Sequence, residues 1–153
     1  MRVLGHDADQ PTILLAEGTA PLREVLTGLL GEAGYRVLAV GAAQALIEQL
    51  RAPIRIDLLI TDTRIHGLPG WQVMPAWEVM QEATLRRPGI PVLQFIDSRA
   101  DAVPKCRGAG PVRLLQKPFS VTALLDAITA LVGKGTAPFP DEPSPARPQI
   151  VRA

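Results

Sequence analysis

Three charged residues, Glu17, Asp62 and Lys117, each follow a short apolar run of the sequence. A carboxylate in such a position can act as a nucleophile and become an acyl phosphate. A second carboxylate can help to hold a divalent cation, which spreads the negative charge of a transferring phosphoryl group. A lysine supplies a compact positive charge to a phosphoryl oxygen. These residue types together predict phosphoryl transfer.

The apolar residues around these three positions predict alternating strands and helices. Two of the runs, Thr12–Ala16 and Asp57–Thr61, are typical of strands buried on both faces of a sheet. Further strands are expected at Tyr35–Val40, Pro91–Ile96 and Val112–Gln116. Apolar residues at helical spacing predict helices at 22–33 (with Thr19 as a cap), at 42–50 and between Ser120 and Gly133. Val73, Trp77, Met80 and Thr84 indicate another helix, which is expected to begin at Pro75.

Five strands that alternate with helices predict a (βα)5 domain. Right-handed crossovers place helices on both faces of a parallel sheet, which gives a three-layer, doubly wound α/β fold. Ligands of such folds bind beyond the carboxyl ends of the strands. Glu17, Asp62 and Lys117 are therefore expected to lie in one cavity at that edge.

Three segments resemble the receiver domains of two-component response regulators. Residues 57–70 (DLLITDTRIHGLPG) resemble the family's buried strand, phosphoacceptor Asp and loop that ends in glycine. Residues 114–119 (LLQKPF) resemble its Lys-Pro-Phe signature, and residues 13–17 followed by Leu22-Arg-Glu resemble its first strand and helix. The resemblance spans Thr12 to Val132, which is nearly the whole region expected to fold.

This resemblance implies a role for each site residue. Asp62 is the phosphoacceptor, and Lys117 contacts the phosphate. Glu17, Asp62 and the backbone carbonyl of Arg64 bind Mg²⁺. The resemblance also implies a flavodoxin-like strand order of 2-1-3-4-5 and a cis peptide bond between Lys117 and Pro118.

The sequence departs from the family's pattern at several positions. Gly18 stands where the family has a second acid, so Mg²⁺ binding should be weak. Strand four ends in Ile96 rather than Thr or Ser, and only a two-residue shift would offer Ser98. Leu114 replaces the aromatic residue of strand five. The resemblance implies a fourth helix around 99–108, but Pro104, Gly108 and Gly110 interrupt it. If a switch is retained, it must use backbone movement in the loop after Ile96.

Other residues with chemical potential have simpler interpretations. His66 is expected to be a solvated loop histidine rather than an acid–base group. Cys106 lies between two basic residues, which would lower the pKa of a thiol, but an incidental exposed cysteine is favoured. Trp71 and Trp77 are expected to pack in the core or in a lid rather than to form a partner-binding face.

Composition narrows the class of protein and its domain organisation. The net charge of +1 gives no reason to expect nucleic acid or an anionic membrane as a partner. A single cysteine excludes an intrachain disulfide, and the absence of a long apolar stretch predicts a cytoplasmic protein. Residues 134–153 include five prolines and predict a disordered tail. We therefore expect a flexible arm at 1–11 and a receiver domain at 12–133.

Two functions remain open from the sequence. The first is a phosphorelay receiver that is not itself an enzyme: it accepts a phosphoryl group on Asp62 from a histidine kinase or phosphotransfer protein and signals to a downstream protein. The second is a pseudo-receiver, a protein interaction module without phosphoryl chemistry. A flavodoxin-like enzyme is disfavoured because the sequence lacks a Gly-rich phosphate loop and catalytic-triad spacing. Whether the domain forms a homodimer is left open.

Overall fold

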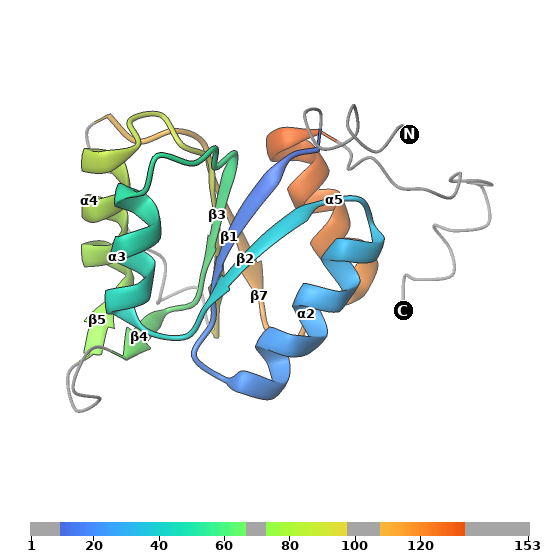
Figure 1. The fold of residues 1–153 in the computed structure, drawn as a ribbon. Coiled ribbons are helices and arrows are strands. Elements are labelled where there is room, and N and C mark those ends of the chain that lie inside the picture. Colours follow the sequence, from blue (N-terminus) through green and yellow to red (C-terminus); the bar gives the residue numbers. More distant parts are fainter. Residues whose placement is uncertain (1–9, 67–72, 98–107, 134–153) are drawn as a thin grey trace.

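A five-stranded parallel sheet forms the centre of the computed structural model, in which we describe residues 10–66, 73–97 and 108–133 (Figure 1). The strands are β1 (Thr12–Ala16), β2 (Arg36–Val40), β3 (Leu58–Thr61), β6 (Val92–Ile96) and β7 (Val112–Gln116). They lie in the order β2-β1-β3-β6-β7, which confirms the predicted order 2-1-3-4-5. Every pair of neighbouring strands is parallel. The first, third and fifth strands of the sequence therefore end at the same edge of the sheet.

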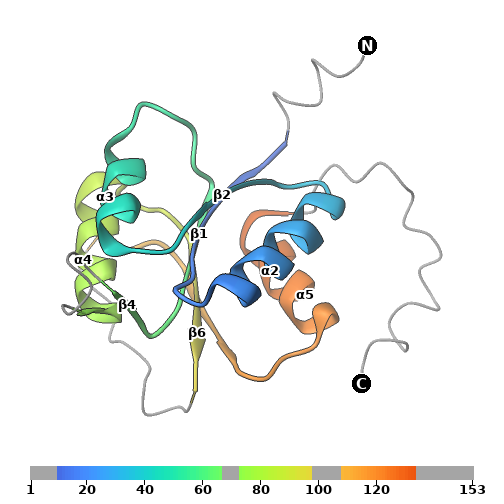
Figure 2. The ribbon, with the colours of Figure 1, turned by 60° about the horizontal axis from the view of Figure 1, so that its bottom comes forward.

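Four helices of the described residues cover the sheet, with helices on both of its faces as the sequence predicted. Helices α3 (Ala43–Arg51) and α4 (Ala76–Arg86) lie on one face, and α2 (Ala20–Glu32) and α5 (Val121–Val132) lie on the other (Figure 2). Neighbouring residues of β1 point to opposite faces of the sheet. Leu14 packs in the cluster under α3 and α4, whereas Ile13 and Leu15 pack in the cluster under α2 and α5. Both faces of this strand are therefore buried, which explains its continuous apolar run.

The helix ends agree with the predicted signals in part. The Ser120 hydroxyl accepts a hydrogen bond of 3.0 Å from the Ala123 amide at the start of α5, and Gly133 follows its end with a φ of 88°. Thr19 occupies the N-cap position of α2, but its side chain makes no capping hydrogen bond. Its amide instead donates to the Glu17 carboxylate.

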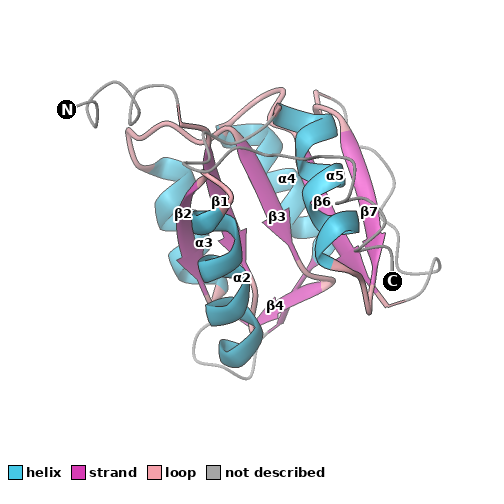
Figure 3. Cartoon of the chain, turned by 90° about the vertical axis from the view of Figure 1, so that its right-hand side faces the viewer, coloured by secondary structure: helices cyan, strands magenta, loops and turns pink. Residues whose placement is uncertain are grey.

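An antiparallel hairpin follows Asp62 where the sequence had predicted only a loop. Strand β4 (Arg64–His66) pairs with β5 (Val73–Pro75), and Figure 3 shows β4 beyond the carboxyl end of β3. Ile65 and Met74 are partners in this hairpin, and both are buried in the cluster under α3 and α4. Burial of this apolar pair attaches the hairpin to the core.

The predicted apolar face of α4 is correct at Met80 and wrong at Val73 and Trp77. The helix begins at Ala76, and Val73 belongs to β5 instead. Trp77 is 53% exposed, so it does not pack in the core. The buried residues of α4 are Ala76, Val79, Met80 and Ala83. Alanine carries little hydrophobic signal but permits close packing, and for this reason the larger residues nearby predicted a face that is wrong in part.

Some predictions concern parts of the chain outside the described residues. These are Trp71, Cys106, most of the helix expected around 99–108, and the tail at 134–153. Among the described residues, no helix has both the length and the apolar character needed to cross a membrane.

Candidate functional site

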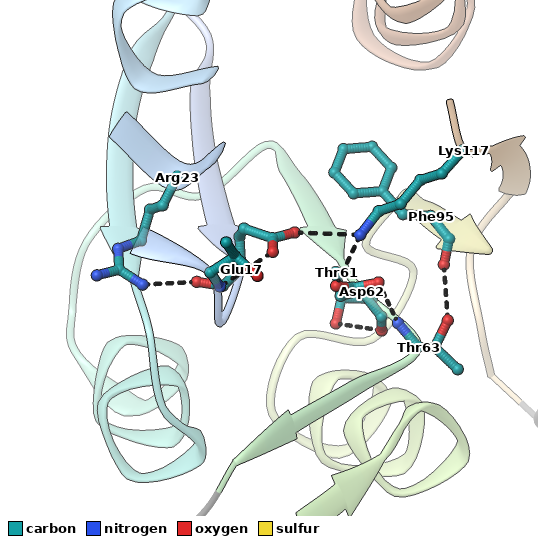
Figure 4. Close-up of polar contacts among 8 residues, drawn as sticks. Glu17, Arg23, Thr61, Asp62, Thr63, Phe95 and Lys117 are labelled. Atoms are coloured by element: carbon teal, nitrogen blue, oxygen red, sulfur yellow. Dashed lines mark hydrogen bonds and ion pairs between the residues drawn. The ribbon is translucent and has the colours of Figure 1, made fainter. Parts of the chain in front are cut away.

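The structure brings the three predicted residues together at the carboxyl edge of the sheet. Lys117 Nζ lies 3.0 Å from Asp62 Oδ2 and 3.9 Å from Glu17 Oε1 (Figure 4). Each residue directly follows a strand: β1, β3 and β7, respectively. We refer to Glu17, Asp62 and Lys117 as the charged site. The prediction that these side chains share one location is confirmed.

Backbone hydrogen bonds fix the position of each residue of the charged site. The Glu17 amide donates to the Val40 carbonyl at 3.1 Å, and the Asp62 amide donates to the Ala16 carbonyl at 3.3 Å. The Lys117 amide donates to the Ile96 carbonyl at 2.8 Å. All three bonds extend the pairing of neighbouring strands, so the sheet itself sets the positions from which the side chains project.

Glu17 is a fully buried carboxylate, with an exposed fraction of 0%. Its Oε2 accepts a hydrogen bond of 3.1 Å from the Thr19 amide, while its Oε1 has no hydrogen-bond donor among the described residues. Burial raises the pKa of Glu17, and the nearby charge of Asp62 adds to this effect. The Thr19 amide and Lys117 act in the opposite direction and partly offset it.

Asp62 presents its two carboxylate oxygens to different partners. Oδ1 accepts a hydrogen bond of 2.7 Å from the Thr63 amide, and Oδ2 faces the Lys117 ammonium. The side chain of Asp62 is 18% exposed, so part of it is accessible to a donor molecule. An oriented carboxylate with an adjacent cation is the arrangement required of a phosphoryl acceptor.

An aromatic pair, one buried ring and one partly buried ring, lies beside Lys117. Its ammonium lies 5.8 Å from the centroid of the Phe95 ring, which in turn contacts the Phe119 ring at 4.8 Å. Phe95 is fully buried in β6. The Lys117–Pro118 peptide bond is cis, as the resemblance implied.

The oxygen atoms at this edge fit a hard divalent cation such as Mg²⁺. Glu17 Oε1 is a buried carboxylate oxygen without a hydrogen bond from any described residue. Arg64 lies opposite Pro75 in the hairpin, and the Ala76 amide donates to the Thr63 carbonyl beside it. Arg64 and Pro75 therefore form a non-hydrogen-bonded pair, in which the Arg64 carbonyl points away from β5. However, no group of three His, Cys, Asp or Glu side chains suitable for a metal occurs in the part of the chain that is described. Mg²⁺ usually takes one or two carboxylates and keeps several waters, so this set suffices for weak binding.

Three of the residues that depart from the family's pattern, Gly18, Ile96 and Leu114, are among those that the structure describes. Gly18 is exposed beside Glu17. Ile96 is the last residue of β6 and is 2% exposed, so an apolar side chain occupies the end of that strand. Leu114 lies in β7 opposite Gln94. His66 lies in β4 rather than in a loop.

Two further residues of the site escaped prediction. The Thr63 hydroxyl donates to the Phe95 carbonyl at 3.3 Å, and Arg23 Nη1 donates to the Glu17 carbonyl at 2.7 Å. Thr63 directly follows the expected phosphoacceptor, and this position in the sequence could have identified it as a residue of the site. The contact of Arg23 depends on how the first turn of α2 folds back over the end of β1, and no spacing in the sequence shows this.

Comparison with known proteins points to one family, although no protein-family model matches the chain. The sequence is 31% identical over 119 residues to the sensory/regulatory protein RpfC of Xanthomonas campestris pv. campestris, covering 78% of this chain and 16% of the relative. It is 34% identical over 125 residues to the transcriptional regulatory protein PdtaR of Mycobacterium tuberculosis, covering 80% of this chain and 57% of the relative. The chain thus spans less than two thirds of the length of either curated relative.

Solved structures of receiver domains share the fold. A response regulator receiver protein from Sinorhizobium medicae superimposes with a TM-score of 0.63 and 29% identity, covering 81% of this chain and 93% of that one. The receiver domain of the sensor histidine kinase PA1611 from Pseudomonas aeruginosa, described with a magnesium ion in its active-site cleft, gives a TM-score of 0.65 at 20% identity, with coverages of 81% and 98%. Since the similarities in sequence and in fold lead to the same class of protein, the chain belongs to the receiver domains of two-component response regulators, as an atypical member of that family.

Proposed function

We propose that this receiver domain accepts a phosphoryl group on Asp62 from a histidine kinase or a phosphotransfer protein. The contact of 3.0 Å between Lys117 Nζ and Asp62 Oδ2 is the observation that carries this proposal. It places a fixed positive charge beside the attacking carboxylate, where the charge of an incoming phosphoryl group would need to be stabilised. The domain is thus the acceptor in a phosphorelay rather than an enzyme that turns over a substrate of its own.

The proposed transfer is a displacement at phosphorus. A carboxylate oxygen of Asp62 attacks the phosphorus of a phosphohistidine, so a P–O bond forms while the P–N bond breaks. The imidazole leaves with the electron pair of the broken bond and takes up a proton. Lys117 binds a phosphoryl oxygen, and the Thr63 amide orients the carboxylate through its bond of 2.7 Å to Oδ1.

A divalent cation has a limited set of ligands here. Glu17, Asp62 and the Arg64 carbonyl would hold Mg²⁺, and the ion when bound would neutralise charge on the phosphoryl group. We expect weak binding because Gly18 supplies no carboxylate. We further propose that the domain acts in the cytoplasm and through protein partners, because a net charge of +1 offers little attraction to nucleic acid or to anionic membranes.

A second candidate is a pseudo-receiver that binds a partner without phosphoryl chemistry. Gly18 favours it because one metal ligand is lost, and Ile96 favours it because β6 ends in a side chain that cannot donate a hydrogen bond. The retained Asp62–Lys117 contact favours phosphoryl transfer over this alternative.

Mass spectrometry after incubation with Mg²⁺ and acetyl phosphate separates the two candidates. A phosphoacceptor gains one phosphoryl group, and Asp62→Asn abolishes the gain. A pseudo-receiver gains none even at high Mg²⁺, and its partner binding is indifferent to Asp62→Asn. A phosphoryl group that survives Asp62→Asn would contradict both candidates, because the chemistry would then lie elsewhere.

A further inference from the structure

The side chain of Thr63 connects the ends of two strands. Its hydroxyl donates to the carbonyl of Phe95, 32 positions away, at a distance of 3.3 Å (Figure 4). Hydrogen bonds from hydroxyl groups usually measure about 2.7–2.8 Å, so this one is long. It joins the residue after Asp62 to Phe95, the second-last residue of β6. Little energy is needed to break so long a hydrogen bond.

The same residue also lies against the expected phosphoacceptor. The Thr63 amide is 2.7 Å from Asp62 Oδ1. Rotation about the first side-chain torsion moves a threonine hydroxyl among three staggered positions on its own backbone. An acceptor group that grows on the Asp62 carboxylate therefore comes within reach of the Thr63 hydroxyl without movement of the main chain.

Phosphorylation of Asp62 would reverse the preference of this hydroxyl. A phosphoryl group brings three strong acceptor oxygens and about 1.5 to 2 negative charges. Hydrogen bonds to a charged oxygen are shorter and roughly twice as strong as those between neutral groups. The competing acceptor, the Phe95 carbonyl, is neutral and 3.3 Å distant.

Neighbouring side chains are less suited to respond. Thr61, on the other side of Asp62, is fully buried, and its hydroxyl donates to the backbone carbonyl of Asp62 at 3.2 Å. Ile96, at the end of β6, has no polar atom in its side chain. Among Thr61, Thr63 and Ile96, it is Thr63 whose hydroxyl contacts β6 and whose amide contacts the Asp62 carboxylate.

We propose that Thr63 is the switch residue of this receiver. When Asp62 is phosphorylated, a condition that rests on the proposed function, the Thr63 hydroxyl moves from the Phe95 carbonyl to a phosphoryl oxygen. The end of β6 then loses a hydrogen bond at a residue whose ring contacts Phe119 and lies beside Lys117. The change therefore reaches the chain that follows β6 and the segment that leads into α5.

A single carbonyl signal reports this switch. Phe95–Ile96 is the one Phe–Ile pair of the sequence, so labelling Phe with ¹³C at the carbonyl and Ile with ¹⁵N gives one NMR correlation for the Phe95 carbonyl. We would compare its position before and during incubation with Mg²⁺ and acetyl phosphate in the full chain. The variants are Thr63→Val, which keeps the amide and the shape but removes the hydroxyl, and Thr63→Ser, which restores the hydroxyl. Thr61→Val is the matched control on the other side of Asp62.

The expected result is a shift of the Phe95 carbonyl signal on phosphorylation in the wild type, in Thr63→Ser and in Thr61→Val. In Thr63→Val the signal should already lie near the phosphorylated position and should not move, although mass spectrometry shows the same gain of one phosphoryl group. An equal shift in phosphorylated Thr63→Val would overturn the proposal. Loss of phosphorylation in Thr63→Val alone would also overturn it, because the hydroxyl would then serve the transfer itself. If the wild type gains no phosphoryl group, the proposed function and this inference fail together.

Discussion

Lys117 Nζ lies 3.0 Å from Asp62 Oδ2 although 55 positions of the sequence separate the two residues. Lys117 Nζ also forms an ion pair with the Glu17 carboxylate, at 3.9 Å from Oε1. Two carboxylates therefore share one ammonium at the edge of the sheet. Removal of this ammonium should affect phosphoryl transfer far more than folding.

Lys117→Ala should lower the rate of Asp62 phosphorylation on the order of 10²-fold, as expected when one preorganised donor to a developing charge is lost. The free energy of unfolding should fall by no more than about 1 kcal/mol, because the ion pair is partly exposed. Mass spectrometry over a time course and urea unfolding measure the two effects. Arg55→Ala, which removes an exposed cation before β3 at the opposite edge, should leave the rate unchanged. Equal rates in Lys117→Ala and the wild type would show that Lys117 does not contact the phosphoryl group.

Gly18→Asp should strengthen Mg²⁺ binding by roughly tenfold, because it adds a third carboxylate beside Glu17 and Asp62. Gly18 is exposed, so the added side chain has room. Isothermal titration calorimetry with Mg²⁺ measures the affinity. Gly28→Asp is the control, since it makes the same glycine-to-aspartate change within α2. Nothing lies within 4 Å of a Cβ added at Gly28. An affinity that rises equally in both variants would indicate a general effect of charge rather than a new ligand.

The strands and the charged site were predictable because both depend on local patterns. A parallel strand covered on both faces must be apolar throughout, so β1 and β3 are visible as runs. A polar residue directly after such a run must lie at the carboxyl edge of the sheet. For this reason the sequence alone places Glu17, Asp62 and Lys117 at one edge of the sheet.

The hairpin and the Thr63 contact could not be predicted in the same way. Strands β4 and β5 have three residues each, which is too short for an alternating pattern to stand out, and glycines and a proline lie between them. The bond from Thr63 to Phe95 depends on how far β6 extends beyond the end of β3. That relationship is set by the packing of the whole sheet rather than by either segment.

Glu17→Gln should stabilise the protein at neutral pH and lose this advantage in acid. Burial raises the pKa of Glu17 above its ordinary value of 4.5, so the folded state binds a proton more readily than the unfolded state does. The stability linked to this group is therefore fully present below pH 4.5 and is lost as the pH rises through the raised pKa. Gln cannot ionise and avoids that loss. Unfolding in urea across this pH range, with a chelator to remove divalent cations, measures the difference.

Glu24→Gln is the control for this experiment, because it removes the same charge from an exposed position in α2. Its effect on the free energy of unfolding should stay within about 0.5 kcal/mol. A Glu17→Gln variant whose advantage grows as the pH falls would contradict the direction of the pKa shift.

Arg87 caps the end of α4 and also binds the end of α3, so its replacement should be costly. Its guanidinium donates to the carbonyls of Leu50 at 3.0 Å, Ala52 at 2.7 Å and Ile54 at 2.7 Å, with a longer contact to Gln49 at 3.4 Å. These carbonyls belong to the last turn of α3 and the chain after it. A positive charge at the end of a helix also interacts favourably with the helix dipole.

Arg87→Lys keeps the charge but cannot donate in several fixed directions at once, since a lysine ammonium lacks the planar geometry of guanidinium. Several carbonyls then lose their donor, and the free energy of unfolding should fall by about 2 kcal/mol. Arg86→Lys is the matched control, because the adjacent Arg86 makes only a partly exposed ion pair with Glu82 at 3.1 Å. Its cost should be no more than about 0.5 kcal/mol. Urea unfolding of the two variants decides the matter: equal costs would show that the carbonyl contacts of Arg87 contribute nothing beyond an ordinary surface arginine.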